Sequence, residues 1–362
     1  MADEIIVVDT GSIDQSREIA VRFGARVFDF PWTDDFAAAR NFSLEQATGT
    51  WILVLDADET ISSRNYPALK KITNETPTTP TAYYLLTRNY TNRHDLVGLH
   101  NNSGDFADEE KGCGWLPSIK VRLWSNHPQI RFFYPVHERV EPALQKLGIE
   151  AQPAPIVIHH YGKLNEQQAR AKGEKYFQIG LQKLQQMDDN AREPIRELAI
   201  QAGILGRHQE AETLWQRYLK LDPDNAEAYL NLGTAQFAAG KLAAALNAAR
   251  TALQLKPGLK EAAFNLALYL LHSGKAQETT QILEKLLQNN PGYQAAHFLY
   301  AAASCCLQNS DNNKFQTDPF ETIRTDILTP KTLQVAASEL VNTLFETGQK
   351  SYANAIKKAV SD

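Results

Sequence analysis

The sequence predicts a protein of two parts, an α/β domain followed by an all-α array of helices. In the first 165 residues, short apolar runs rich in β-branched residues alternate with helical segments. From residue 190 onward, glycine and proline recur at a fixed interval between segments of helical periodicity. These two patterns predict different architectures, so we expect two domains rather than one.

The chain begins with a β–turn–α–β unit. Glu4–Val8 and Arg26–Phe30 are the predicted strands, and Asp14–Phe23 is the helix between them. The first strand runs into a small polar turn over residues 9–12, whose glycine lets the backbone approach a ligand closely. Asp9 can accept hydrogen bonds from a sugar or a base, although the same residues also make an ordinary turn.

A second helix follows, which begins after Asp34 or Asp35 and ends before Gly49. It carries Arg40, whose guanidinium can hold two phosphate oxygens at once. The alternative interpretation is a surface arginine on an amphipathic helix.

Two carboxylates follow a buried strand in the most informative stretch of the chain. Trp51–Leu55 is apolar, and Asp56 and Asp58 stand at its carboxyl end. Their side chains project to the same side of an extended chain. Two oxygen ligands there suit Mg²⁺ or Mn²⁺, and ligands of open α/β sheets bind outside the carboxyl ends of strands. The alternative is a turn with two solvated acids.

Residues 61–190 lie between these segments and the repeated helices. The predicted elements are three strands and a helix that begins near Glu141, with the strands at Ala82–Tyr90, Lys120–Trp124 and Pro155–Tyr161. Thr91–Pro117 is polar and rich in glycine and proline, and we predict a mobile loop there over the active site.

Residues 3–60 resemble family 2 glycosyltransferases of the GT-A type, through the runs DEIIVVDTGS, FPW, DDFAAARN and WILVLDADE. The resemblance implies a mostly parallel, Rossmann-type sheet and a nucleotide-diphospho-sugar donor. It assigns donor binding to Asp9, Thr10, Gly11, Ser12, Arg40, Asn41 and Asp56, and metal binding to Asp56 and Asp58. Many family members have two acids where this chain has Asp9-Thr10, which leaves the nucleotide contact at this turn open.

The resemblance also departs from the family at its start. Family members begin with an apolar strand and a helix before the segment that here starts at Asp3. We therefore expect either that residue 1 is not the native start or that the domain is degenerate and no longer binds donor. An apolar first strand with an open edge would also be an aggregation hazard.

An inverting transfer needs a base that takes the acceptor proton while the sugar carbon is attacked opposite the leaving diphosphate. Later segments, RLW, VHE and HYG, also resemble the family. We predict Glu138 as the base, and the competitors are Asp34, Asp35 and His137. His160, at a strand end, is the predicted third metal ligand, because imidazole suits Mn²⁺ better than Mg²⁺. The non-functional alternatives are an ordinary acid before a helix for Glu138 and a hydrogen-bonded histidine at a strand end for His160.

The second half repeats every 34 residues. Proline recurs at 223, 257 and 291, and glycine at 206, 240 and 274. This helix–turn–helix period matches the tetratricopeptide repeat. We predict three units near 190–223, 224–257 and 258–291, and a first helix of another at Tyr293–Leu307. Such stacks typically hold an extended peptide or a protein on their concave surface. The alternatives, which the sequence leaves open, are that the repeats brace the first domain or dimerise it.

The predicted division of the chain is a transferase-like domain over 1–165, a connecting helix over 166–189, repeats over 190–308 and a helical tail over 309–362. In the tail, helices are expected at Lys331–Thr347 and Tyr352–Val360 after a polar loop.

Composition limits the function classes. A net charge of −5 over 362 residues gives no support for a nucleic-acid binder. No run resembles a membrane span or a signal peptide, and three cysteines lack metal-site spacing, so we predict a cytoplasmic protein with buried, reduced thiols.

The sequence therefore predicts an inverting, metal-dependent transferase that moves a sugar from a nucleotide-sugar to an unknown acceptor. The alternative is a non-catalytic repeat scaffold with a degenerate transferase domain. A nucleotidyltransferase is a weaker third interpretation, because a glycine-rich, basic phosphate loop is not visible.

Overall fold

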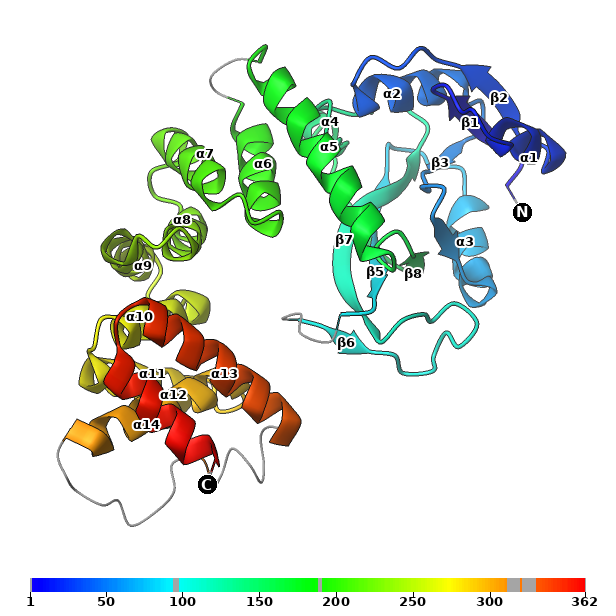
Figure 1. The fold of residues 1–362 in the computed structure, drawn as a ribbon. Helices are drawn as coiled ribbons and strands as arrows, with labels where there is room; N and C mark the ends of the chain where they lie inside the picture. The colour runs from blue at the N-terminus through cyan, green and yellow to red at the C-terminus, as the bar shows by residue number, and fades with distance from the viewer. Residues whose placement is uncertain (1, 94–97, 188–190, 311–319, 321–329, 362) are drawn as a thin grey trace. The chain divides into compact units, whose positions relative to one another are not determined.

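The computed structural model describes residues 2–93, 98–187, 191–310, 320 and 330–361. The chain divides into two compact units, Met1–Asp189 and Asn190–Asp362. Unit 1 holds the described strands and helices α1–α5, and unit 2 holds helices α6–α14 (Figure 1). The two predicted architectures are thus present as separate units, and each is described by itself.

The first β–α–β unit of the chain is a small parallel ribbon. Strand β1 (Ile6–Asp9) pairs in parallel with β2 (Arg26–Asp29), and helix α1 (Ser16–Arg22) connects them. Within the described residues β1 pairs with no other strand, so its second edge is open. This unit is a two-stranded sheet of its own rather than part of a larger one.

A six-stranded sheet forms the centre of unit 1. Its strands lie in the order β3-β7-β5-β8-β4, and β6 pairs with β7. Their bounds are β3 (Trp51–Leu53), β4 (Glu59–Ile61), β5 (Ala82–Thr91), β6 (His100–Asn101), β7 (Gly114–Ser125) and β8 (Gln152–His160).

The prediction of a mostly parallel sheet is wrong. Within the six-stranded sheet β5 and β8 pair in parallel, whereas the other described pairs are antiparallel. Strands β5 and β7 are neighbours in the sheet, and no described helix lies between them in the chain. A parallel pairing of consecutive strands needs a crossover, usually a helix, so these two strands pair antiparallel.

Helices cover both faces of this sheet. They are α2 (Phe36–Gln46), α3 (Tyr66–Thr73), α4 (Glu141–Lys146) and α5 (Glu166–Leu184), with a 3₁₀ turn at Ser63–Asn65. One apolar core joins Ile52 and Trp124 to Leu44 of α2 and Leu144 of α4. The other packs Leu85, Leu123, Ile156 and Ile158 against α3. Burial on both faces explains why the β3 run is apolar without alternation.

The segment predicted as a loop over Thr91–Pro117 contains more strand than expected. Thr91 ends β5, β6 lies within the segment, and Gly114–Pro117 belongs to β7. Residues 94–97 lie outside the described residues. Strand β4 and helix α3 were not predicted at all, because three strand residues after a turn leave little pattern to detect.

Unit 2 confirms the predicted helix pairs. They are α6 (Arg192–Ile204) with α7 (His208–Leu221), α8 (Ala226–Ala238) with α9 (Leu242–Leu255), and α10 (Lys260–His272) with α11 (Ala276–Asn289), followed by α12 (Gln294–Ser310). The turn glycines at 206, 240 and 274 have φ of +77°, +76° and +76°, a left-handed conformation that favours glycine. The glycine that recurs every 34 residues in the sequence therefore marks the C-terminal end of the first helix in each pair.

The C-terminal helices α13 (Pro330–Glu346) and α14 (Lys350–Ser361) pack against the end of the repeat array. Their apolar residues join one core with α10, α11 and α12. His272 of α10 is 1% exposed, and its Nδ1 lies 2.9 Å from the Thr347 hydroxyl. The Tyr352 hydroxyl donates to the Gly274 carbonyl at 2.8 Å. The predicted tail helices are thus present and belong to unit 2.

The fold also bears on two predictions from composition. No helix among the described residues has the length and apolar character needed to cross a bilayer. None of the three cysteines, all in the described part of the chain, is in a disulfide; Cys305 and Cys306 are buried, whereas Cys113 is partly exposed.

We expect unit 2 to lose stability as the pH falls below 6.5. Burial lowers the pKa of His272 to about 4. Between that value and the ordinary 6.5 the unfolded chain binds more protons, so the free energy of unfolding falls with pH, by about 2 kcal/mol from pH 7.5 to 5. Urea unfolding of the wild type and of His272→Gln at both pH values tests this. The variant should lose less stability, whereas His297→Gln, at a partly exposed position of α12, should behave as the wild type.

Candidate active site

Arg40 of α2 connects two carboxylates that are far apart in the sequence. Its Nε lies 2.5 Å from Glu138 Oε1, and its Nη2 lies 2.5 Å from Asp56 Oδ1. The aromatic ring of Phe132 lies beneath the guanidinium, 5.5 Å from its carbon. The structure therefore brings together three predicted site residues, on α2, after β3 and in the segment before α4.

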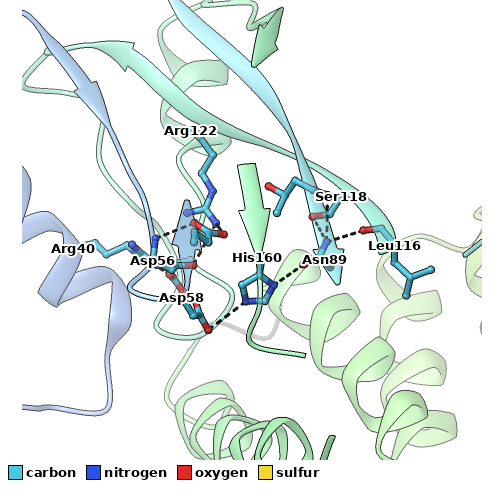
Figure 2. Close-up of polar contacts among 11 residues, drawn as sticks. Arg40, Asp56, Asp58, Asn89, Leu116, Ser118, Arg122 and His160 are labelled. Atoms are coloured by element: carbon cyan, nitrogen blue, oxygen red, sulfur yellow. Dashed lines mark hydrogen bonds and ion pairs between the residues drawn. The ribbon is translucent and has the colours of Figure 1, made fainter. Parts of the chain in front are cut away.

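A second arginine holds Asp56 from the sheet. Arg122 of β7 reaches Asp56 Oδ2 at 3.3 Å and Glu59 Oε1 at 2.7 Å. The other Glu59 oxygen accepts the Asp56 backbone N–H at 2.9 Å. The side chains of Arg122 and Glu59 are only 7% and 3% exposed, so their ion pair is buried. Figure 2 shows Asp56 held between Arg40 and Arg122.

The charges around Asp56 determine its protonation. Burial alone would raise the pKa of Asp56, but the positive charges of Arg40 and Arg122 outweigh burial and hold that pKa well below its usual range. Asp56 is therefore an anion at neutral pH, and its charge is compensated by protein cations.

The segment that carries Glu138 is pinned to α2. Asn41 accepts the Phe132 N–H at 2.7 Å and donates to the Phe132 carbonyl at 3.0 Å. The Phe36 N–H donates to the Pro135 carbonyl at 2.8 Å. Within this segment His137 has φ of 56°, in the left-handed region that costs a non-glycine residue about 1–3 kcal/mol. Asn41, predicted to bind donor, therefore positions the Glu138 segment instead of standing free.

Asp58 and His160 face each other from two chain segments. The carboxylate Oδ2 lies 3.4 Å from the imidazole Nε2, and the side chains are 34% and 18% exposed. The Tyr161 N–H donates to the Asp58 carbonyl at 3.0 Å, which ties the end of β8 to the turn after β3. A hydrogen bond with His160 lowers the pKa of Asp58, so Asp58 is also ionised at neutral pH.

The turn over residues 9–12 forms a separate group. The Ser12 N–H donates to Asp9 Oδ1 at 3.1 Å, and Arg17 lies 3.5 Å from Asp9 Oδ2. Gly11 has φ of 111°, a conformation that favours glycine. In the described parts of the chain, no hydrogen bond or ion pair connects this turn to the Arg40 cluster. The structure thus brings the carboxylates together but does not join the predicted donor turn to them.

The competing base candidates have other partners. Asp35 is the N-cap of α2, as predicted, and its Oδ1 accepts the Ala38 N–H at 2.9 Å. Asp34 accepts the indole N–H of Trp32 at 2.8 Å. Glu138 alone among the three acids shares an arginine with Asp56.

The described residues contain no group of three or more histidine, cysteine or acidic side chains arranged to hold a metal. Asp58 and His160 are only two potential ligands, and both carboxylate oxygens of Asp56 form ion pairs with arginines. A carboxylate–imidazole pair fits a divalent cation such as Mn²⁺ if that cation takes the rest of its ligands from water and substrate phosphates.

Sequence reasoning missed three residues of this site: Arg122, Glu59 and Asn89. Each is a polar residue inside or beside a strand, where an apolar one is the norm. Glu59 directly follows the two aspartates, and Arg122 interrupts the apolar end of β7. These polar residues could be seen in the sequence, but the residue that each of them contacts could not.

Comparison with known families identifies both parts of the chain. Residues 1–107 match the family model for glycosyl transferase family 2. These residues are a glycosyltransferase family 2 domain. Residues 195–323 match the model for the middle TPR-like domain of cilia and flagella-associated protein 70, and a TPR-like repeat region follows the transferase domain. The resemblance predicted from the motifs is confirmed. The family 2 domain indicates sugar transfer, and its family commonly uses a divalent metal.

Curated relatives match parts of the chain. A TPR repeat-containing protein of Synechococcus elongatus is 35% identical over 175 residues, which is 46% of this chain and 38% of that protein. An uncharacterized glycosyltransferase of Rickettsia felis is 39% identical over 62 residues, 17% of this chain and 22% of that protein. The chain therefore spans less than half the length of these relatives.

Solved structures give similarities at low identity. The MamA protein is 20% identical with a TM-score of 0.35, covering 51% of this chain and 88% of that chain. The TPR protein YrrB is 16% identical with a TM-score of 0.35, covering 54% of this chain and 88% of that chain.

Proposed function

We propose that the family 2 domain transfers a sugar from a nucleotide-diphospho-sugar with inversion, in a reaction that depends on a divalent metal. The observation that carries this proposal is the Asp58–His160 pair, whose Oδ2 and Nε2 face each other at 3.4 Å while both side chains remain partly exposed. A carboxylate and an imidazole converging from two segments suit Mn²⁺, and the donor diphosphate would supply further oxygens.

The metal, when bound, would offset the negative charge that develops on the leaving diphosphate. The chain's own residues supply the remaining chemistry. Glu138 is the proposed base, and Arg40 orients it relative to Asp56 through contacts of 2.5 Å to each carboxylate. His137, next to Glu138 in the same strained segment, is the competing base.

Calorimetric titration with UDP, with and without Mn²⁺, tests the donor site. We expect binding that needs Mn²⁺ and that falls by at least about 100-fold in Asp58→Ala, because that substitution removes one of the two protein ligands. Asp108→Ala, at an exposed position of the same unit, should bind as the wild type. GDP and TDP would be titrated in the same way.

A protein that ignores all three nucleotides would contradict this proposal and favour the second candidate, a non-catalytic interaction scaffold. One observation supports that alternative: the β1–β2 ribbon, which carries the turn over residues 9–12, shares no strand pairing with the six-stranded sheet in the described residues. In either case the repeat array of unit 2 is a proposed surface for a protein or an extended peptide.

A further inference from the structure

Asn89 is a buried amide in the interior of β5, directly behind the Asp58–His160 pair. It is 8% exposed, and its Oδ1 lies 2.9 Å from His160 Nδ1. Strands β5 and β8 pair in parallel with Asn89 opposite His160, so the two side chains leave the same face of the sheet. Figure 2 shows the imidazole of His160 between Asn89 on one side and Asp58 on the other.

The neighbours of Asn89 fix the orientation of its amide. Its Nδ2 lies 3.0 Å from the Leu116 carbonyl and 3.0 Å from the Ser118 hydroxyl. A hydroxyl can donate or accept, but a carbonyl can only accept, so the Leu116 contact requires the NH₂ group on that side. With the amide reversed, two oxygens would face each other without a proton. The Asn89 oxygen must therefore point at His160.

This orientation determines the tautomer of His160. An amide oxygen accepts, so the imidazole nitrogen that faces it carries the proton, and the neutral ring is the Nδ1–H form. The lone pair of the neutral ring is then on Nε2, which faces Asp58 Oδ2 at 3.4 Å. Two acceptors directed at each other need a positive charge between them, which is a proton on Nε2 in the metal-free protein or a divalent cation that replaces it.

Gly162 keeps the space beside this pair free. A Cβ at this position would overlap Asp58 Oδ2 and lie 2.7 Å from His160 Nε2. A larger residue here would push the Asp58 and His160 side chains away from their present positions, so glycine permits their close approach, and its backbone conformation does not require it.

We propose that Asn89 is a positioning residue, which holds His160 in the Nδ1–H tautomer. The Nε2 lone pair of His160 and the Asp58 carboxylate then form a two-ligand site for a divalent cation. Gly162 leaves the space beside this site open. This inference rests on the proposed function, since it specifies how that metal would be held. Partners that orient a ligating histidine are worth about 10- to 100-fold in metal affinity.

Long-range ¹H–¹⁵N correlation spectra of the metal-free protein, at alkaline pH where imidazoles are neutral, report the tautomer directly. The His160 signal is assigned with His160→Gln. We expect the Nδ1–H form in the wild type and its loss in Asn89→Leu. Asn89→Asp keeps an acceptor for Nδ1–H and should keep the tautomer. Asn126→Leu is the matched control, because Asn126 holds the Ala47 and Gly49 carbonyls but no histidine.

Mn²⁺ titrated into the same samples broadens the resonances of a nearby histidine and so reports binding without activity. Asn89→Leu should need about 10- to 100-fold more Mn²⁺ to broaden the His160 signal. Gly162→Ala should weaken Mn²⁺ binding while the His160 tautomer stays Nδ1–H. This variant distinguishes the effect of the space beside the pair on Mn²⁺ affinity from the effect of the ring orientation.

An Nε2–H tautomer in the wild type, or equal Mn²⁺ affinity in wild type and Asn89→Leu, would overturn this inference and leave the proposed function standing. Absence of Mn²⁺ broadening in the wild type, with a correct tautomer, would overturn the cation site and with it the metal dependence of the proposed reaction. UDP binding that persists without metal would point to the same failure.

Discussion

Arg122→Met is expected to lower the free energy of unfolding of unit 1 by about 3–5 kcal/mol. The substitution leaves Glu59, whose side chain is 3% exposed, as a buried carboxylate without its arginine at 2.7 Å. It also removes one of the two cations that keep Asp56 ionised. Hydrogen exchange of the β7 amides measures the effect within unit 1 and is independent of unfolding in unit 2.

A double variant identifies the cause of this loss. Arg122→Met combined with Glu59→Met replaces the ion pair by apolar side chains of similar volume, which is often neutral or stabilising, so most of the stability should return. Lys120→Met, at an exposed position of β7, should change stability by less than about 0.5 kcal/mol. A loss below about 1 kcal/mol in Arg122→Met would mean that water reaches the pair and screens it.

The repeat array could be predicted almost completely because its information is local. Each unit ends a helix at a glycine with φ near +76° and is followed by a proline, so the sequence period marks the helix boundaries directly. Packing between units then repeats the same contacts. The transferase domain offered no such period, and only its strands, not their partners, were visible.

Strand pairing in the sheet could not be predicted from the strands alone. The apolar first half of β5 could pair on either edge in either direction, and the polar residues of its second half do not name a partner strand. Its neighbours, β7 and β8, are fixed by the two cores on opposite faces, which collect residues from distant segments. The family resemblance suggested parallel pairing, and the antiparallel β5–β7 pair overrides it.

The site was predicted in part for a related reason. Asp58 and His160 are each placed by the end of a strand, and their approach follows from the β4–β8 pairing. Sequence position does not reveal which cation compensates which carboxylate, so the bond from Arg40 to Glu138, across 98 positions of the chain, was not foreseen. Asn89 was overlooked in the polar second half of β5, although a buried amide there is normally hydrogen-bonded.

Arg40→Lys is expected to slow turnover of the nucleotide-sugar by about 10²–10³-fold, although the positive charge is kept. Arg40 uses two different nitrogens, each 2.5 Å from a carboxylate oxygen of Glu138 or Asp56. A single ammonium cannot reproduce this fork, so one of the two carboxylates loses its orientation. The measurement is release of nucleoside diphosphate from the donor class that the binding experiments identify, with Mn²⁺ present.

The kinetic parameters distinguish orientation from binding. If Arg40 mainly orients Glu138 for proton removal, kcat falls while KM for the donor changes little; if it mainly holds donor, KM rises and kcat is kept. Arg139→Lys is the matched control, because Arg139 adjoins Glu138 but its side chain is 37% exposed and pairs with Glu141 at 3.5 Å. A loss below about threefold in Arg40→Lys, with an unchanged circular dichroism spectrum, would show that the bridge between the two carboxylates is not needed for transfer.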